Sequence, residues 1–435
     1  MAGARDFISA NSIETVELAV VDTQGAIRGK RVPARALLEG AEFAMSSGLY
    51  CLDYGLDVLA AGEYSWATGY PDVFLVPDLD TLRLVSWRPG TALVFCDVVD
   101  GAGRPVPLDP RLILRRAEDQ ARQAGYEPCF GLETEFYLLD PDTLRPRHPR
   151  IPIYSLHDDS YLWPVVRDIQ AALQAAGIVV EASGAEYGAG QVEINLGWSA
   201  PVAAADDLLY FRYAVKQIAA SHGLLATFMA KPWAESSGSG LHVHQSLRSR
   251  ETGRNVFWDA ATGELSAPAR WYLGGLLHHA AETCCVAVPT SNGYKRTSGY
   301  SFAPTQVTWG FDHRSAAVRA LLRGDGGTRL EHRVAAADAN PYFLVATQLL
   351  AGLAGLEKQL EPPPAATSDV YAATGAEPLP RRLSEALACL QNSSFARSAL
   401  GEEVVELLGV LGRAEQAAAD AAVTGWERRR DLESV

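Results

Sequence analysis

The sequence predicts an α+β protein made of a small N-terminal domain and a larger domain that follows it. A chain of 435 residues is too long for one small core. Short strand-like stretches dominate the first hundred residues, whereas strands and helices alternate afterwards. The segment 100–110, DGAGRPVPLDP, combines Gly, Pro and Asp and marks the boundary. We therefore predict one domain over residues 1–105 and a second over residues 106–435.

The N-terminal domain is predicted to be rich in β-structure. Residues 14–21, ETVELAVV, are typical of a strand, and a DTQG turn leads to a second strand near Arg31. The stretch from Ala34 to Gly48 predicts a short helix, and residues 93–98 predict another strand. Short strands with one helix indicate a small β-rich domain.

The larger domain is predicted to contain long helices and strands in alternation. Apolar spacing predicts helices over residues 111–125 and 206–223, and strands over residues 129–140 and 191–198. The Pro-rich stretch 361–369 predicts a solvent loop, and the Ala-, Leu- and Glu-rich chain from about residue 380 predicts helices.

Composition excludes several classes of function. The net charge of −14 argues against a nucleic-acid binder, because no basic excess is available to neutralise phosphates. The six cysteines show no zinc spacing and no disulfide framework, so we expect reduced thiols. The chain begins without a secretory signal and contains no run of 18 apolar residues, so we expect a cytoplasmic protein without membrane contact.

Two acidic motifs are candidates for metal binding. Glu133 and Glu135 are two residues apart in a predicted strand, so both carboxylates face the same side. Glu186 and Glu193 bracket the Gly-rich turn YGAGQV, which can bring them together. Taken alone, the first motif is more typical of a solvated edge strand and the second of a hairpin with polar ends.

Two further motifs combine histidine, arginine and glutamate. The Gly-rich loop SGSG leads into His242 and His244, whose imidazoles are good metal ligands on one strand face. Arg329, Glu331 and Arg333 alternate in a predicted strand. The histidines alone suit a polar strand face, and the Arg-Glu-Arg row suits either a salt-bridge ladder or a metal ligand between anion-binding guanidinium groups.

The motifs as a set are more specific than any one of them. Five glutamates and one histidine supply three ligands for each of two divalent ions, and their hard oxygen atoms favour Mg²⁺ or Mn²⁺. Several arginines in residues 296–333 would hold a phosphorylated, anionic intermediate beside these ions.

The ordered motifs resemble the glutamine synthetase family. The stretch 227–246, TFMAKPWAESSGSGLHVHQS, is similar to the family's ATP-site signature, and SNGYKR, HRSAAVR, RLEHR and ANPY follow in the family's order. The resemblance covers residues 110–345 and, more loosely, the N-terminal domain. It implies a β-grasp-like N-terminal domain, a catalytic domain with a curved antiparallel sheet and helices, and the use of ATP with two to three Mg²⁺ or Mn²⁺ ions.

The resemblance also implies roles for individual residues. One metal is expected to bind Glu135, Glu186 and Glu193, and the second to bind Glu133, His242 and Glu331. Glutamate is expected to bind Arg296, Arg333, Gly238 and Ser237. Nucleotide or phosphate positions are Trp198, His244, Ser246, Arg314, Arg319 and Arg329. The expected catalytic residues are Arg296, Arg314, Arg333 and Asp53, the last in place of a missing aspartate-glycine-serine-serine signature for ammonium.

Departures from the family suggest a different nucleophile. Phe302 occupies the flap position, in TSGYSFAP, where glutamine synthetases carry a glutamate that deprotonates ammonium. Ser237 replaces the usual asparagine of the glutamate pocket. Glutamine synthetase-like enzymes that use polyamines or small alkylamines often carry an aromatic residue in this flap. We therefore predict an ATP-dependent ligase that joins the γ-carboxylate of L-glutamate to an organic amine through γ-glutamyl phosphate, with Phe302 lining the amine site.

Two alternatives remain open at this point. The chain could be a glutamine synthetase that uses ammonia with a relocated base, or an inactive family member with a structural or regulatory role. The family also implies a dodecamer of two hexameric rings, with active sites shared between subunits. Tyr371 lies roughly where some bacterial relatives are adenylylated, but its surroundings differ, so we expect an ordinary exposed tyrosine.

Overall fold

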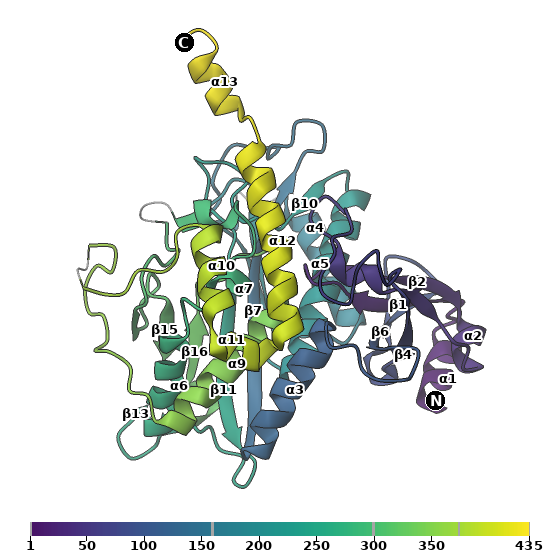
Figure 1. The fold of residues 1–435 in the computed structure, drawn as a ribbon, viewed down its shortest axis with the longest axis horizontal. Helices are drawn as coiled ribbons and strands as arrows, with labels where there is room; N and C mark the ends of the chain where they lie inside the picture. The colour runs from purple at the N-terminus through teal and green to yellow at the C-terminus, as the bar shows by residue number, and fades with distance from the viewer. Residues whose placement is uncertain (1, 158–160, 298–300, 373–374, 435) are drawn as a thin grey trace.

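A computed structural model describes residues 2–157, 161–297, 301–372 and 375–434. The chain forms two separate main sheets with helices packed mainly on the second, which confirms the predicted α+β class. Figure 1 shows the N-terminal sheet to one side of a larger body in which the helices α3 (Pro110–Gln123), α9 (Pro341–Lys358) and α12 (Glu402–Ala421) stand in front of the second sheet.

The N-terminal sheet has six strands, in the order β2-β1-β6-β4-β3 with β5 paired to β6. Its central strands β1 and β6 are parallel and the other pairs are antiparallel. The strands are β1 (Thr15–Val21), β2 (Ile27–Pro33), β3 (Ala44–Ser46), β4 (Asp72–Pro77), β5 (Arg83–Leu84) and β6 (Thr91–Val99). The helix α1 (Ala2–Ala10) precedes them.

The helix predicted from Ala34 to Gly48 is wrong beyond its first turns. Helix α2 covers only Ala34–Leu38, and Gly40 follows with φ of 71°. Residues 44–46 instead pair with β4, after which a 3₁₀ turn, η1, covers Ser47–Cys51. Tertiary strand pairing therefore overrides the helical propensity of this stretch.

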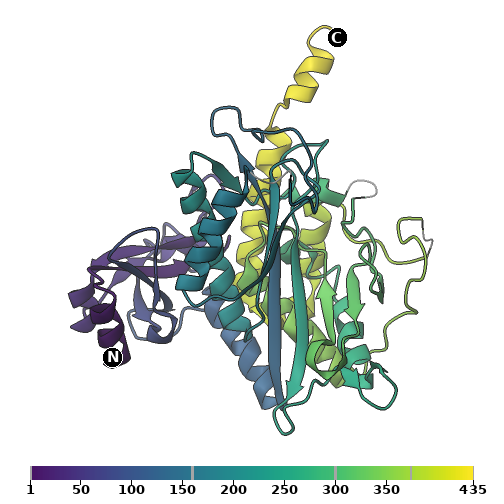
Figure 2. The same ribbon diagram turned by 180° about the vertical axis from the view of Figure 1, so that it is seen from behind.

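The second sheet has eight strands and carries the predicted acidic motifs. Its order is β14-β15-β16-β11-β7-β9-β8, with β10 on β7, and among the strand pairs of the described residues only β14–β15 is parallel. The strands are β7 (Tyr126–Leu139), β8 (Val180–Ala185), β9 (Gln191–Leu196), β10 (Leu225–Thr227), β11 (Leu241–Ser249), β14 (Trp309–Phe311), β15 (Val318–Leu321) and β16 (Arg329–His332). Figure 2 shows the long strands β7 and β11 from the side opposite the C-terminal helices.

Helices cover the apolar face of this sheet. On β7 the side chains of Phe130, Leu132 and Phe136 are fully buried, whereas Glu133 and Glu135 alternate onto the other face. The remaining longer helices are α4 (Trp163–Ala175), α5 (Pro201–Ser221), α6 (Ala267–His278), α10 (Leu383–Asn392), α11 (Ser394–Leu400) and α13 (Gly425–Asp431). The short elements are α7 (Cys284–Ala287), α8 (Gly324–Gly327), η2 (Leu79–Thr81), η3 (Gly293–Thr297), β12 (Trp258–Asp259) and β13 (Glu264–Leu265).

A buried arginine joins the N-terminal sheet to helices α3 and α5 of the larger body. Arg111 of α3 is 2% exposed and pairs with Asp78 and Asp97 beside the N-terminal sheet and with Asp206 of α5. Such a network is costly to leave incomplete, so it fixes the geometry between the two parts. The predicted boundary at residue 105 falls between β6 and α3 and stays a prediction. None of the helices in the described stretches is long and apolar enough to cross a membrane.

Candidate functional site

Strand register brings the acidic motifs together. His242 of β11 lies directly opposite Glu133 of β7, and Glu193 of β9 lies opposite Glu135. On the other side of β11, His244 pairs with Glu331 of β16. Opposite residues in neighbouring strands are about 5 Å apart, so four strands gather these side chains on one face. We call Glu133, Glu135, Glu186, Glu193, His242, His244 and Glu331 the carboxylate cluster.

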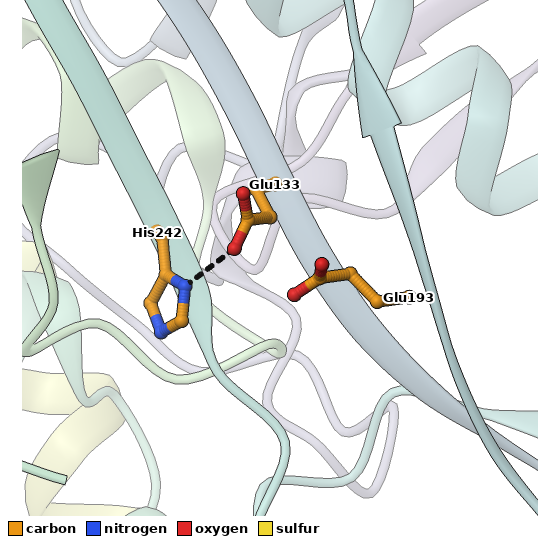
Figure 3. A group of neighbouring side chains, drawn as sticks. All are labelled: Glu133, Glu193 and His242. Carbon is orange, nitrogen blue, oxygen red and sulfur yellow. Dashed lines mark hydrogen bonds and ion pairs between the residues drawn. The ribbon is translucent and has the colours of Figure 1, made fainter. Parts of the chain in front are cut away.

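Glu133 is the centre of this cluster. Its Oε1 lies 2.9 Å from His242 Nδ1 (Figure 3). Its Oε2 lies 3.4 Å from His244 Nε2. Among the described residues, two groups offer ligand atoms that all lie within 4.8 Å of one another: Glu133 with Glu193 and His242, and Glu133 with His244 and Glu331. These groups differ from the two predicted ligand sets, which therefore stay predictions.

The raised pKa values of several cluster glutamates indicate that a cation would stabilise the charged form of the cluster. Burial, together with nearby Glu186, raises the pKa of Glu135 to about 7. Burial and the adjacent Glu133 raise the pKa of Glu193, and burial also raises that of Glu186. Burial would raise the pKa of Glu133 too, but the two histidines outweigh it and hold it well below its ordinary value. Carboxylates that raise one another's pKa in this way fit a divalent cation with oxygen ligands.

Glu331 is held by arginines as well as facing the histidines. It is 1% exposed and pairs with Arg333 and, at 3.0 Å, with Arg319 Nη1. Its pKa is lowered, because Arg333 and His242 outweigh the effect of burial. Both predicted readings of the Arg-Glu-Arg row, the salt-bridge ladder and the metal ligand, therefore remain compatible with this geometry.

A cavity of about 640 Å³ adjoins the cluster. All the positions predicted for nucleotide or phosphate line it: Trp198, His244, Ser246, Arg314, Arg319 and Arg329. Arg329 Nε donates to His244 Nδ1 at 3.1 Å, and the guanidinium of Arg248 lies 5.5 Å from the Trp198 ring. Arg248 was not predicted, because nothing local in the sequence distinguishes it from a surface arginine.

A second cavity of about 320 Å³ shares Glu133, Tyr154, Glu193 and Arg314 with the first. The positions predicted for glutamate and amine all line it: Ser237, Gly238, Arg296, Phe302 and Arg333. A Cβ atom on Gly238 would lie 2.5 Å from Cγ of Arg296, so only glycine lets this loop approach the arginine. The buried Arg296 donates to the carbonyls of Val334 and Arg333, which fixes its direction.

Three aromatic side chains form one wall of the second cavity. Phe302 and Tyr187 lie with ring centroids 5.7 Å apart, and Tyr154 lines the same cavity. We call Tyr154, Tyr187 and Phe302 the aromatic wall. Phe302 and Tyr154 both adopt positive φ, at 58° and 52°, in the left-handed region that favours glycine. Tyr154 and Tyr187 were not predicted, although Tyr187 directly follows the singled-out Glu186.

Two other predicted positions behave differently. Asp53 lies in the loop after η1, where its carboxylate accepts the N–H of Asp57 at 2.9 Å, and it lines neither cavity. Its catalytic role stays a prediction. Tyr371 is not the exposed tyrosine that we expected: it is half-buried, and its hydroxyl donates to the Ala303 carbonyl at 3.1 Å. Residues 298–300 of the predicted flap lie outside the described residues.

Comparisons with known proteins agree with this geometry. The family model "Glutamine synthetase, catalytic domain" matches residues 107–431. Glutamate–isopropylamine ligase from Pseudomonas sp. is 37% identical, over 99% of this chain and 97% of its own length. Gamma-glutamylethanolamide synthetase from Streptomyces coelicolor is 36% identical, over 98% and 94%.

A solved structure has a similar fold over the whole chain. The GmaS complex with ADP superposes with a TM-score of 0.88 at 30% identity, over the whole of both chains. The predicted family and fold are thereby confirmed over the full length. The chain belongs to the glutamine synthetase family of carbon–nitrogen ligases.

Proposed function

We propose that this ligase joins the γ-carboxylate of L-glutamate to a small organic monoamine, using ATP and divalent metal. The observation that carries the proposal is the aromatic wall beside the carboxylate cluster, in one cavity. The cluster provides the chemistry common to the family, whereas the wall lacks the acidic flap side chain that ammonia use would require. One relative is named for the ligation of isopropylamine and another for the synthesis of γ-glutamylethanolamide, and both names support the same interpretation.

Glutamate would bind at the arginine end of the smaller cavity. Arg296 and Arg333 are almost fully buried and carry fixed guanidinium groups, which suit carboxylates as paired donors. The loop at Gly238 and Ser237 closes this end. Ser237 is shorter than the family's asparagine, so the acid substrate is part of the proposal.

ATP would occupy the larger cavity, with its phosphates directed towards the shared charged residues Glu133, Glu193 and Arg314. The carboxylate cluster would hold Mg²⁺ or Mn²⁺, which when bound offsets charge on the transferred phosphoryl group. Arg314 is exposed and lines both cavities, so its guanidinium can contact the phosphoryl group before and after transfer. Phosphorylation turns the γ-carboxylate into an acyl phosphate whose phosphate is a good leaving group.

The amine must lose a proton before or during its attack on the acyl phosphate. Phe302 cannot accept this proton. Glu186 precedes Tyr187 of the aromatic wall and lines the same cavity, and burial raises the pKa of its carboxyl above the ordinary value. We propose that a Glu186 carboxylate oxygen left free of metal receives the proton, while the aromatic wall covers part of the intermediate against water.

We propose monoamines rather than polyamines as the preferred substrates. The rings of Tyr187 and Phe302 suit an alkyl tail, and the wall itself offers no carboxylate to pair with the second ammonium group of a polyamine. The carboxylates that line the cavity belong to the cluster, not to the wall. An apolar or hydroxylated alkyl tail needs no such partner and gains from contact with the rings.

The proposal includes the assembly that the family implies. A dodecamer of two hexameric rings in the cytoplasm would let the N-terminal domain of one subunit complete its neighbour's site. Asp53 lines neither cavity of its own chain, as expected of a residue that acts in a neighbouring subunit.

The direct test is ATP-dependent phosphate release with glutamate and a panel of ammonia, isopropylamine, ethanolamine, aniline, putrescine and spermine, with products identified by mass. We expect the monoamines to support turnover and to appear as γ-glutamyl amides. Turnover with ammonia alone would favour the alternative of a glutamine synthetase. The absence of turnover with every amine, together with no effect of Mg²⁺-ATP on the melting temperature, would favour an inactive family member.

A further inference from the structure

The connection between α9 and α10, residues 359–382, forms a series of hydrogen bonds with the segment that follows Phe302. This connection runs beside β15 at one side of the molecule (Figure 1). Its hydrogen bonds join Trp309 to Pro363 and Ala366, His313 to Ser368, Val307 to Glu377, Thr305 to Leu379, and Ala303 to Tyr371. One stretch of chain therefore supports residues 303–313 from end to end.

Among these hydrogen bonds, the one made by Tyr371 lies nearest to Phe302 in the sequence. Its hydroxyl donates to the carbonyl of Ala303 at 3.1 Å, and Ala303 is 2% exposed. On the other side of Phe302, Ser301 Oγ donates to the carbonyl of Arg296 at 3.0 Å. The backbone of Phe302 is thus tied on both sides, once to the glutamate-binding arginine and once to Tyr371.

Phe302 needs this support because of its backbone conformation. A φ of 58° costs a non-glycine residue roughly 1 kcal/mol or more, and such conformers persist only where the surroundings enforce them. The ring of Phe302 is 46% exposed, so burial of its own side chain supplies little of that constraint. Burial raises the pKa of the Tyr371 hydroxyl, which therefore remains protonated and able to donate.

We infer that Tyr371 is a positioning residue for amine selectivity, which holds Phe302 against Tyr187 through the Ala303 carbonyl. Tyr371 lines neither cavity and is not itself a predicted ligand of glutamate or metal. It acts on the backbone next to the aromatic wall. The effect on amine selectivity rests on the proposed function. The effect on the backbone around Phe302 does not depend on it.

The test compares Tyr371→Phe with the parent enzyme. The substitution removes one hydroxyl and keeps the ring. Loss of the bond to the Ala303 carbonyl, about 1 kcal/mol, predicts roughly a fivefold lower kcat/KM for isopropylamine, mainly through the KM for the amine. The KM values for glutamate and ATP should stay unchanged, and the preference for isopropylamine over methylamine should fall.

Tyr210→Phe is the matched control. Tyr210 of α5 also donates its hydroxyl to a backbone carbonyl, that of Leu84, and it lines neither cavity. We expect this variant to keep the amine preference of the parent enzyme. Equal changes in both variants, or a Tyr371→Phe enzyme with unaltered amine selectivity, would overturn the inference.

Hydrogen exchange supplies the readout that does not depend on catalysis. Faster exchange in peptides covering residues 301–307 of Tyr371→Phe, with exchange in β7 and β11 unchanged, is expected whichever nucleophile the enzyme uses. Unchanged exchange at 301–307 would refute the positioning role by itself. If the parent enzyme rejects all organic amines while exchange still responds, the proposed function fails and the positioning of Phe302 stands.

Discussion

The carboxylate cluster and the aromatic wall share one cavity but are held by different kinds of structure. The cluster is built mainly on β7, β9, β11 and β16, where strand register fixes each side chain against the next. The wall stands on turns and connections, with Tyr154 and Tyr187 respectively 71% and 48% exposed. A rigid sheet suits chemistry that must stay the same, whereas loops can change to suit a new substrate.

The contrast predicts different consequences for substitution in the two regions. Changes in the carboxylate cluster should lower turnover with every amine alike. Changes in the aromatic wall should alter the choice among amines and leave phosphoryl transfer largely intact. A cluster variant that changes the choice among amines, or a wall variant that lowers turnover with every amine alike, would show that the two regions do not have separate roles.

The largest effect is expected at Glu133. Glu133→Gln removes the charge that both histidines contact, and loss of several kcal/mol of charge stabilisation predicts roughly a 1,000-fold lower kcat for all amines. Steady-state phosphate release measures this effect. Glu251→Gln, the same change on an exposed turn, is the control and should retain parent activity. A loss confined to one amine would contradict the shared role of the cluster.

An intermediate effect is expected at Phe302. An aromatic pair contributes about 0.5–1.5 kcal/mol beyond buried area, so Phe302→Ala should lower kcat/KM for isopropylamine by up to about tenfold. The rate with ammonia, which has no alkyl tail to contact the ring, should hardly change. Phe311→Ala removes a similarly exposed ring that packs on Trp309 outside both cavities, and should alter neither rate. Equal losses with both nucleophiles would place Phe302 outside the amine site.

The smallest effect is a pH-dependent stabilisation by metal. The pKa of Glu135 rises from 4.5 to about 7 in the folded protein, and that of Glu193 is raised as well. The folded state then binds more protons than the unfolded chain from about pH 4.5 upwards, so metal-free stability should fall as pH rises towards 7. A divalent ion replaces those protons as the balancing charge. Mg²⁺ should therefore raise the melting temperature by a few degrees more at about pH 8 than at about pH 5.5.

Thermal unfolding with and without Mg²⁺ at the two pH values measures this difference. Glu133→Gln should remove most of the metal-induced shift, and Glu251→Gln should keep it. An equal shift at both pH values would mean that these carboxylates do not hold the ion.

Sequence reasoning predicted the cluster better than it predicted the wall. The spacing of Glu133 and Glu135 places both on one strand face, and the structure has them there. Their meeting with His242 depends on pairing between residues 109 positions apart, which no local pattern encodes, so the family resemblance was needed. Tyr154 reaches the cavity only through a loop with positive φ, and no periodicity predicts that.

The same limit explains two other differences. The stretch from Ala34 to Gly48 has a helical composition, but strand pairing between Ala44 and Phe74 decides its structure. Tyr371 lies just after the Pro-rich stretch 361–369, which forms neither helix nor strand, in agreement with the predicted loop. The direction of its side chain follows instead from a bond to Ala303, 68 residues away. Local sequence sets propensity, whereas long-range contacts set which loop residues face the site.

A direct competition between nucleophiles is the measurement that tests the central claim. The enzyme would be given ATP, Mg²⁺, glutamate and equal concentrations of ammonia and isopropylamine, and the two amide products would be quantified by mass spectrometry. The aromatic wall and the absence of an acidic side chain at position 302 predict γ-glutamyl-isopropylamide in large excess over glutamine. Glutamine as the main product would contradict the account.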